Sequence, residues 1–211
     1  MIRLFARPMP FALLLIFASF IPVMMAAVRV LQIPAGWLPE DSLRLSAAPA
    51  AHWLHALAGV WFGLLGPVQF VRALRLRFGR LHRVAGRVFV LAGIVMGLSG
   101  LGLLMRVESI ATPLLDIARA VFSAALIAVL LLGLRAGRTG QRGAHRAWMI
   151  RAYALGMGGA TVALVMLPLY LITGEALSGL PSDLVFLAWW VIMIALGEWV
   201  IRMVSIREFR I

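Results

Sequence analysis

The sequence predicts an all-α integral membrane protein with six transmembrane helices. Three observations lead to this prediction. Apolar residues make up 63% of the chain and the mean hydropathy is +1.00, whereas soluble domains are about half apolar. Six segments approach the length of about 20 apolar residues that a helix needs to cross a bilayer. Arginines gather in every second connection between these segments, as they do in multi-pass membrane proteins.

The six predicted spans follow one another closely, so residues 1–211 are expected to form a single polytopic membrane domain. The first span follows Arg3 and Arg7 and resembles a signal peptide. Its apolar core is longer than the roughly 7–15 residues of a signal sequence, which favours a retained helix. The predicted spans are residues 9–31, 52–71, 84–105, 113–134, 148–172 and 184–204.

The arginines predict the orientation of the chain. All 20 basic residues are Arg, and sixteen of them fall on one side of the six-span arrangement. Because cytoplasmic connections carry the excess of basic residues, both termini are expected in the cytoplasm. The absence of Lys is typical of a GC-rich bacterial genome. The net charge of +12 thus reflects topology and does not indicate nucleic-acid binding.

Two of the arginine-rich connections repeat a short motif. "RLHRVAGR" (residues 80–87) and "RGAHRAWMIR" (residues 142–151) each place a His-Arg pair at the start of an apolar helix. Spans two and three form a hairpin around the first motif, and spans four and five form a hairpin around the second. The pattern predicts a central four-helix bundle of spans 2–5, built as a parallel repeat of two hairpins.

The histidines are expected to face the inside of this bundle. Small residues step by three or four positions from His55 in the second span, from His82 in the third and from His145 in the fifth. Such stripes let helices approach closely, and plain helix packing explains them as well as a bound ligand does. His82 and His145 would lie near the cytoplasmic end of the bundle, and His55 near the outer end.

The arginines beside two of these histidines predict an anionic partner. A helix N-terminus carries positive partial charge, so arginines there are disfavoured unless an anion is bound. We expect Arg83, Arg87, Arg146 and Arg151 to surround one anionic site. Headgroups of the anionic cytoplasmic leaflet are the simplest ligand, and a cofactor propionate or a phosphorylated ligand is the alternative.

Charged residues also occur as close pairs near the ends of two predicted spans. Asp116 and Arg119 are three residues apart in span four, and Glu198 and Arg202 are four apart in span six. Charges within spans indicate function by default. Near a span end, paired neighbours are more often structural, and we interpret both pairs in that way.

The motifs carry a family resemblance. His55, "GPVQF" (66–70, which includes Gln69), "LHRVAGR" (81–87) and "HRAWMIRAYAL" (145–155) resemble the signature of a bacterial membrane-protein family catalogued as domain of unknown function 2306. The resemblance covers about residues 50–170. It implies a polytopic inner-membrane protein of unassigned chemistry. In architecture alone, the histidine-bearing core also resembles membrane di-haem cytochromes and ferric reductases.

Three functions remain open at this point. The favoured one is an accessory membrane subunit that binds an anionic lipid or ligand on its cytoplasmic side and joins a larger membrane complex. The second is a haem b-binding electron-transfer protein, in which His82 and His145 ligate the iron, arginines hold the propionates and His55 serves an outer haem or a quinone. The third is a transporter of small molecules or ions that uses His, Arg and Gln69. The chain has no cysteine, so thiolate metal ligands are excluded.

The arginine asymmetry makes a prediction about topology. A reporter fused after Ile211 will be active if it is one that works in the cytoplasm and inactive if it is one that works in the periplasm. The reason is that sixteen arginines lie on the side of the chain that carries the C-terminus. The measurement compares a cytoplasmic and a periplasmic reporter at the same fusion point. Activity of the periplasmic reporter would reverse the orientation.

Overall fold

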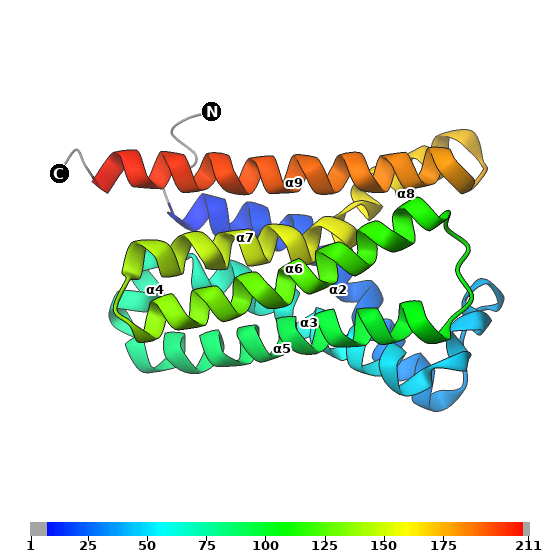
Figure 1. Cartoon of the computed structure of the whole chain (residues 1–211), viewed down its shortest axis with the longest axis horizontal. Coiled ribbons are helices and arrows are strands. Elements are labelled where there is room, and N and C mark those ends of the chain that lie inside the picture. The colour runs from blue at the N-terminus through cyan, green and yellow to red at the C-terminus, as the bar shows by residue number, and fades with distance from the viewer. Residues whose placement is uncertain (1–7, 209–211) are drawn as a thin grey trace. The chain divides into compact units, whose positions relative to one another are not determined.

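The computed structural model describes the backbone of residues 8–208 and the side chains of residues 13–40, 42–71 and 75–203. This part of the chain folds into helices and contains no strand (Figure 1), so the predicted all-α fold is confirmed. The elements are α2 (Pro8–Ala35), the 3₁₀ helix η1 (Glu40–Ala47), α3 (Pro49–Gln69), α4 (Arg72–Arg77), α5 (Gly79–Arg106), α6 (Pro113–Arg138), α7 (Arg142–Thr161), α8 (Ala163–Thr173) and α9 (Gly179–Glu208).

Five helical segments among the described residues are long and apolar enough to cross a membrane. The remaining predicted span corresponds to α3, which forms a helix of 21 residues but is not one of these five. Its two histidines, His52 and His55, make it less apolar than the other spans. The five segments are Leu13–Ala35, Gly79–Arg106, Pro113–Arg138, Arg142–Thr173 and Gly179–Met203.

Several helices extend beyond the predicted spans and take in the arginines. α5 begins at Gly79 and not at residue 84, α7 begins at Arg142 and not at residue 148, and α6 continues to Arg138. The prediction counted only apolar residues, but arginine is a good helix former and continues a helix past the bilayer. Only residues 139–141 are left to connect α6 with α7, and Gly140 makes this turn with a φ of +75° that favours glycine.

The chain divides into two compact units, Met1–Val107 and Glu108–Ile211. The predicted hairpin α3–α5 belongs to the first unit and packs with α2. The predicted hairpin α6–α7 belongs to the second unit and packs with α9. The four-helix bundle, the parallel repeat and the single domain over residues 1–211 stay predictions.

In the first unit, α3 is the central helix and lies beside α2 and α5 (Figure 1). Near its start, the indole N–H of Trp53 donates to the carbonyl of Val30, near the end of α2, at 3.1 Å. Further along, Phe62 and Phe89 stack with ring centroids 4.4 Å apart, and both are almost completely buried. α3 therefore runs antiparallel to α2 and shares its core with α5.

In the second unit, α7 lies between α6 and α9 and close to both. A Cβ atom on Gly158 or Gly159 of α7 would overlap the ring of Trp190 on α9. The same ring donates its N–H to the carbonyl of Leu155 at 3.0 Å. Glycine at these two positions therefore allows the α9 indole to lie directly on the backbone of α7.

The predicted fifth span contains a local irregularity near its middle. α7 ends at Thr161 and α8 begins at Ala163, with Val162 between them. The Thr161 hydroxyl donates back to the carbonyl of Met157 at 2.8 Å, a contact that tends to bend helices. Pro168, inside α8, lacks the N–H that a continuous helix would use. Val162 itself keeps a right-handed helical backbone, with φ −57° and ψ −23°, so α7 and α8 follow one another within one span with a local irregularity that the hydropathy pattern did not predict.

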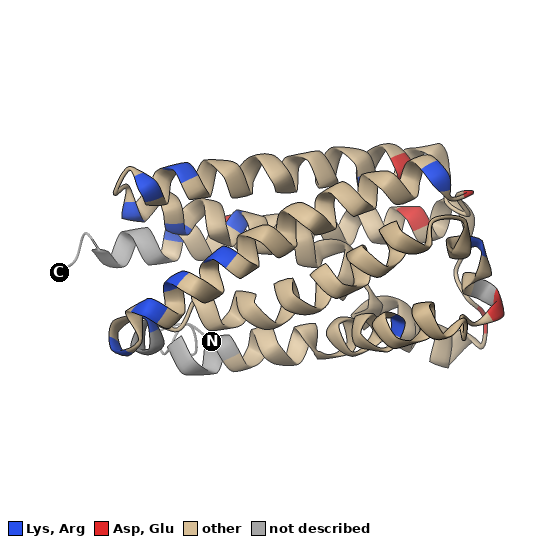
Figure 2. Cartoon of the chain, turned by 90° about the horizontal axis from the view of Figure 1, so that it is seen from below, with Lys and Arg blue, Asp and Glu red and all other residues tan. Residues whose placement is uncertain are grey.

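Arginines gather toward one end of each unit (Figure 2). In the first unit, arginines gather on α4 and at the start of α5, opposite Arg106 at the end of α5. In the second, arginines gather at the end of α6 and the start of α7, opposite Asp116 at the start of α6. Five further arginines assigned to the same side lie outside the described side chains: Arg3, Arg7, Arg72, Arg207 and Arg210.

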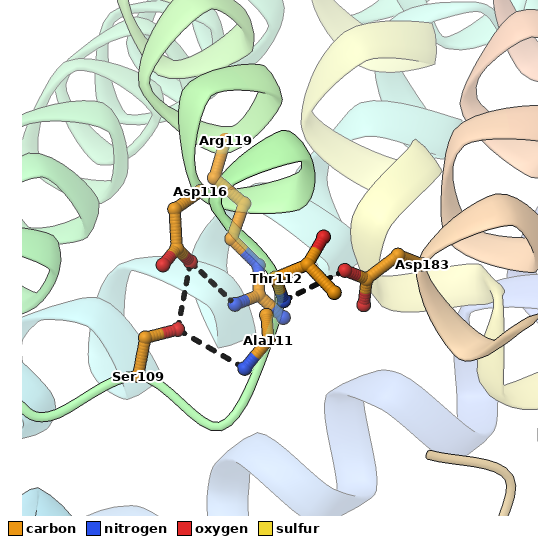
Figure 3. Close-up of polar contacts among 6 residues, drawn as sticks. All are labelled: Ser109, Ala111, Thr112, Asp116, Arg119 and Asp183. Carbon is orange, nitrogen blue, oxygen red and sulfur yellow. Dashed lines mark hydrogen bonds and ion pairs between the residues drawn. The ribbon is translucent and has the colours of Figure 1, made fainter. Parts of the chain in front are cut away.

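The acidic end of the second unit contains a small polar cluster (Figure 3). Asp183 of α9 is only 2% exposed and accepts a hydrogen bond from the backbone N–H of Thr112, the N-cap residue of α6, at 2.8 Å. Asp116 accepts from the Ser109 hydroxyl at 2.9 Å and pairs with Arg119 at 3.3 Å. The predicted pair Asp116–Arg119 is therefore confirmed, and the cluster fixes the start of α6 against α9.

Replacing Asp183 with Ala will destabilise the protein by about 1–3 kcal/mol, because the part-buried backbone N–H of Thr112 loses its acceptor. Asp183→Asn keeps a side-chain oxygen and will cost less. The control is Asp116→Ala, which removes a partly exposed pair worth about 0–1 kcal/mol. Thermal unfolding of the purified protein in detergent measures all three, and equal losses for Asp183→Ala and Asp116→Ala would contradict the capping role.

Candidate functional site

The two motif histidines occupy the same position in their helices. His82 is the fourth residue of α5, and its backbone N–H donates to the carbonyl of Phe78 at 3.0 Å. His145 is the fourth residue of α7, and its backbone N–H donates to the carbonyl of Gln141 at 2.9 Å. The predicted location in the first helical turn is confirmed for both. Sharing of one iron by these histidines stays a prediction.

The imidazole of His145 is tied to the neighbouring helix. Its Nδ1 lies 2.8 Å from the carbonyl oxygen of Gly133 on α6. Since a carbonyl only accepts, Nδ1 carries the proton, and of the two neutral tautomers only the one with its lone pair on Nε2 fits this contact. Gly137 provides the space, because a Cβ there would lie 3.0 Å from Nδ1. This is the arrangement in which a histidine can ligate a metal through Nε2.

His55 is held in the same way in the first unit. Its Nδ1 lies 3.1 Å from the carbonyl oxygen of Met96 on α5 and 3.3 Å from the hydroxyl of Ser99. That hydroxyl donates to the carbonyl of Val95 at 2.6 Å. One turn earlier, His52 is buried and its Nδ1 makes no hydrogen bond within the described residues. His55 therefore faces the inside of its unit, as predicted.

Gln69 and Gly86 bring the other two motifs of the first unit together. The side-chain oxygen of Gln69, at the end of α3, lies 3.3 Å from where a Cβ on Gly86 of α5 would be. The amide nitrogen of Gln69 is buried without a hydrogen-bond partner among the side chains described. The "GPVQF" and "LHRVAGR" motifs thus form one contact at the arginine-rich end of the unit.

The start of α5 concentrates positive charge. It has no acidic residue in its first turn and no side-chain cap. Arg83 and Arg87 are exposed, and the Nη1 of Arg83 lies 3.6 Å from the Cβ position of Gly79, over the positive end of the helix. α7 starts in the same way, without an acid or a side-chain cap. Arg146 of α7 is half-buried and makes an interaction of its own.

Arg151 is not one of the exposed arginines at the helix starts. Its Nε and Nη2 donate to the two carboxylate oxygens of Glu198 on α9, at 2.5 and 3.0 Å. The guanidinium carbon also lies 4.8 Å from the centre of the Trp148 ring. Glu198, which the sequence places beside Arg202, thus pairs with Arg151 on a different helix. This bidentate pair lies within two of the candidate membrane spans.

Comparison with known proteins agrees with the motifs. The model of a family described as predicted membrane proteins (DUF2306) matches residues 52–201. The chain belongs to the DUF2306 family. No curated protein and no solved structure matches the chain. The DUF2306 region extends past the predicted boundary near residue 170 and takes in most of α9, including Glu198.

The DUF2306 motif "HRAWMIR" can now be assigned contacts within the second unit. His145 bonds to α6, Met149 fills the space above Gly133, and Arg151 pairs with α9. The sequence did not reveal the Arg151–Glu198 pair, because Arg151 was assigned to a cytoplasmic connection. The pair could have been predicted from the rule that charged residues inside spans pair with one another. Within the described part, no three His, Asp or Glu side chains lie close enough to hold a metal ion.

The ion pair makes a prediction about coupling. Arg151→Gln and Glu198→Gln will each destabilise the protein, because each leaves a charge without its partner in a low-dielectric region. The double variant will lose less than the sum of the two, with a coupling energy of about 1–2 kcal/mol. Unfolding of the three variants in detergent gives the coupling. Additive losses would show that the pair is not formed.

Proposed function

We propose that this DUF2306 protein is an accessory subunit of the bacterial inner membrane that binds an anionic headgroup at its arginine-rich, cytoplasmic end. The observation that carries the proposal is the start of α5. There, the N–H groups of residues 79–81 lack intrahelical acceptors, the helix has no acidic or side-chain cap, and three arginines stand one turn apart. Together these groups form an anion-binding surface. This α5 arginine cluster consists of Arg80, Arg83 and Arg87.

In this proposal the chain crosses the membrane six times, with both termini in the cytoplasm. α3 supports it, because 21 residues reach about 31 Å, the thickness of the hydrocarbon core. Two polar side chains of α3 bond to neighbouring helices: His55 bonds to α5 and Trp53 bonds to α2. Contacts of this kind allow polar side chains to lie within a bilayer.

The lipid preference of the protein tests the headgroup site. We expect purified protein in phosphatidylcholine nanodiscs to be stabilised when phosphatidylglycerol is added, and less so at high salt, because exposed charges are screened. Replacing the α5 arginine cluster with Gln will remove the preference. Arg106→Gln, at the opposite end of the same helix, is the matched control and will keep it. A preference that survives in the cluster variant would overturn the proposal.

A haem b-binding electron-transfer protein is the second candidate, because the Nδ1–H of His145 is bound to a carbonyl and Nε2 is left to ligate iron. Bound haem would supply one-electron chemistry, and the arginines would hold its propionates. The absorption spectrum of the purified protein separates the candidates. A Soret band that His145→Ala abolishes while the protein remains folded favours haem. Its absence in wild-type protein removes this candidate.

A further inference from the structure

An arginine and a histidine come together where the end of α2 lies against the start of α3. The indole N–H of Trp53 holds the two helices together by donating to the carbonyl of Val30 at 3.1 Å. Arg29 precedes Val30 in α2, and His52 precedes Trp53 in α3. The charge of Arg29 lies close enough to act on the His52 ring. The contact between the helices therefore places both side chains in one region.

Arg29 carries a positive charge that the described residues do not neutralise. Its Nη1 donates to the side-chain oxygen of Gln32 at 3.0 Å, and its Nη2 donates to the hydroxyl of Ser42 on η1 at 2.8 Å. Both acceptors are neutral, and no carboxylate in the described part of the chain forms an ion pair with Arg29. A guanidinium has several further N–H donors, of which the Nε–H of Arg29 makes no hydrogen bond to a described residue. The guanidinium can therefore still bind an anion.

His52 is the second group without a partner. It is only 7% exposed, and its ring makes no hydrogen bond to any residue that the structure describes. Nδ1 is completely enclosed, whereas Nε2 is not one of the enclosed atoms. Burying a polar group without a hydrogen bond is unfavourable, so buried side chains of this kind usually have a partner. The tautomer with its proton on Nε2 offers a donor to a ligand.

The charges around this ring favour an anion as that ligand. Arg44 of η1 also acts on His52, so two positive charges lie near the ring. The start of α3 adds positive partial charge, because it has neither an acidic residue in its first turn nor a side-chain cap. Both arginines would repel a metal cation bound to His52. The exposed Glu40 forms no ion pair among the described residues.

We propose that a terminal phosphate group binds between Arg29 and His52 at the start of α3. The Nε–H of Arg29 and the Nε2–H of His52 donate to different oxygens of the phosphate, which offers three acceptors and neutralises the arginine. The site is separate from the α5 arginine cluster. A Cβ on Gly102, near the other end of α5, would lie 3.7 Å from the Cβ of Ala51 at the start of α3.

Thermal unfolding of the full chain in a neutral detergent tests the site. The parent protein has its α5 arginine cluster replaced with Gln, so that phosphate bound there does not contribute. Inorganic phosphate is titrated against chloride at constant ionic strength, and the stabilisation gives an apparent dissociation constant. Arg29→Gln and His52→Phe will each weaken binding about tenfold, because each removes a hydrogen bond to a charged group. Arg106→Gln, at the end of α5, is the matched control and will bind as the parent does.

Arg29→Lys separates binding from a structural role of the arginine. Lysine keeps the positive charge but cannot hold Gln32 and Ser42 in the fork geometry of a guanidinium. We expect Arg29→Lys to bind phosphate more tightly than Arg29→Gln does, whatever the loss of stability without phosphate. Equal binding by these two variants would contradict a site that depends on charge.

The source of the phosphate is found by a second titration, with phosphatidic acid in phosphatidylcholine nanodiscs. Stabilisation by inorganic phosphate that depends on Arg29 identifies a soluble ligand. Stabilisation that depends on Arg29 but occurs only with phosphatidic acid identifies a lipid with a terminal phosphate. The proposal is overturned if neither probe stabilises the parent, or if both stabilise Arg29→Gln as strongly as the parent.

Discussion

A bilayer supplies no hydrogen bonds, so every polar group within a span must find its partner inside the protein. Four side-chain N–H groups of this chain meet the requirement by bonding to backbone carbonyls of neighbouring helices, whereas the Gln69 amide nitrogen is buried without a partner among the described residues. In the first unit, Trp53 bonds to α2 and His55 bonds to α5. In the second, His145 bonds to α6 and Trp190 bonds to α7. Each such bond is worth only about 0.6–2 kcal/mol, but each also fixes how far one helix is shifted along the next.

Fixed helix positions explain why two charges can lie inside the second unit. The Trp190 ring covers Gly158 and Gly159, and the Ala154 methyl lies 3.1 Å from the Cβ position of Gly197. These close approaches bring α7 against α9 with Arg151 opposite Glu198. The pair then meets in a bidentate geometry, which arginine forms and lysine does not.

The sequence predicted the features that depend on local composition. Hydropathy predicted the helices. The spacing of the arginines predicted the charged ends of the units and the position of His82 and His145 in the first turn of their helices. It did not predict the partner of Arg151, because that contact joins residues 47 apart on two helices and leaves no periodic pattern. Helix ends were missed where arginines continue a helix beyond its apolar stretch. The irregularity at Val162 was missed because it leaves no mark in the hydropathy pattern.

Whether α3 crosses the membrane decides between five and six spans, and with it the side on which the arginine-rich ends lie. The chain has no cysteine, so a single cysteine reports its own position. The most direct measurement labels Ser46→Cys, before α3, and Arg80→Cys, after it, with a membrane-impermeant maleimide in intact cells and in inverted vesicles. Six spans with cytoplasmic arginines predict that Ser46→Cys reacts in intact cells and that Arg80→Cys reacts only in inverted vesicles. Labelling of both positions from the same side would contradict the crossing of α3.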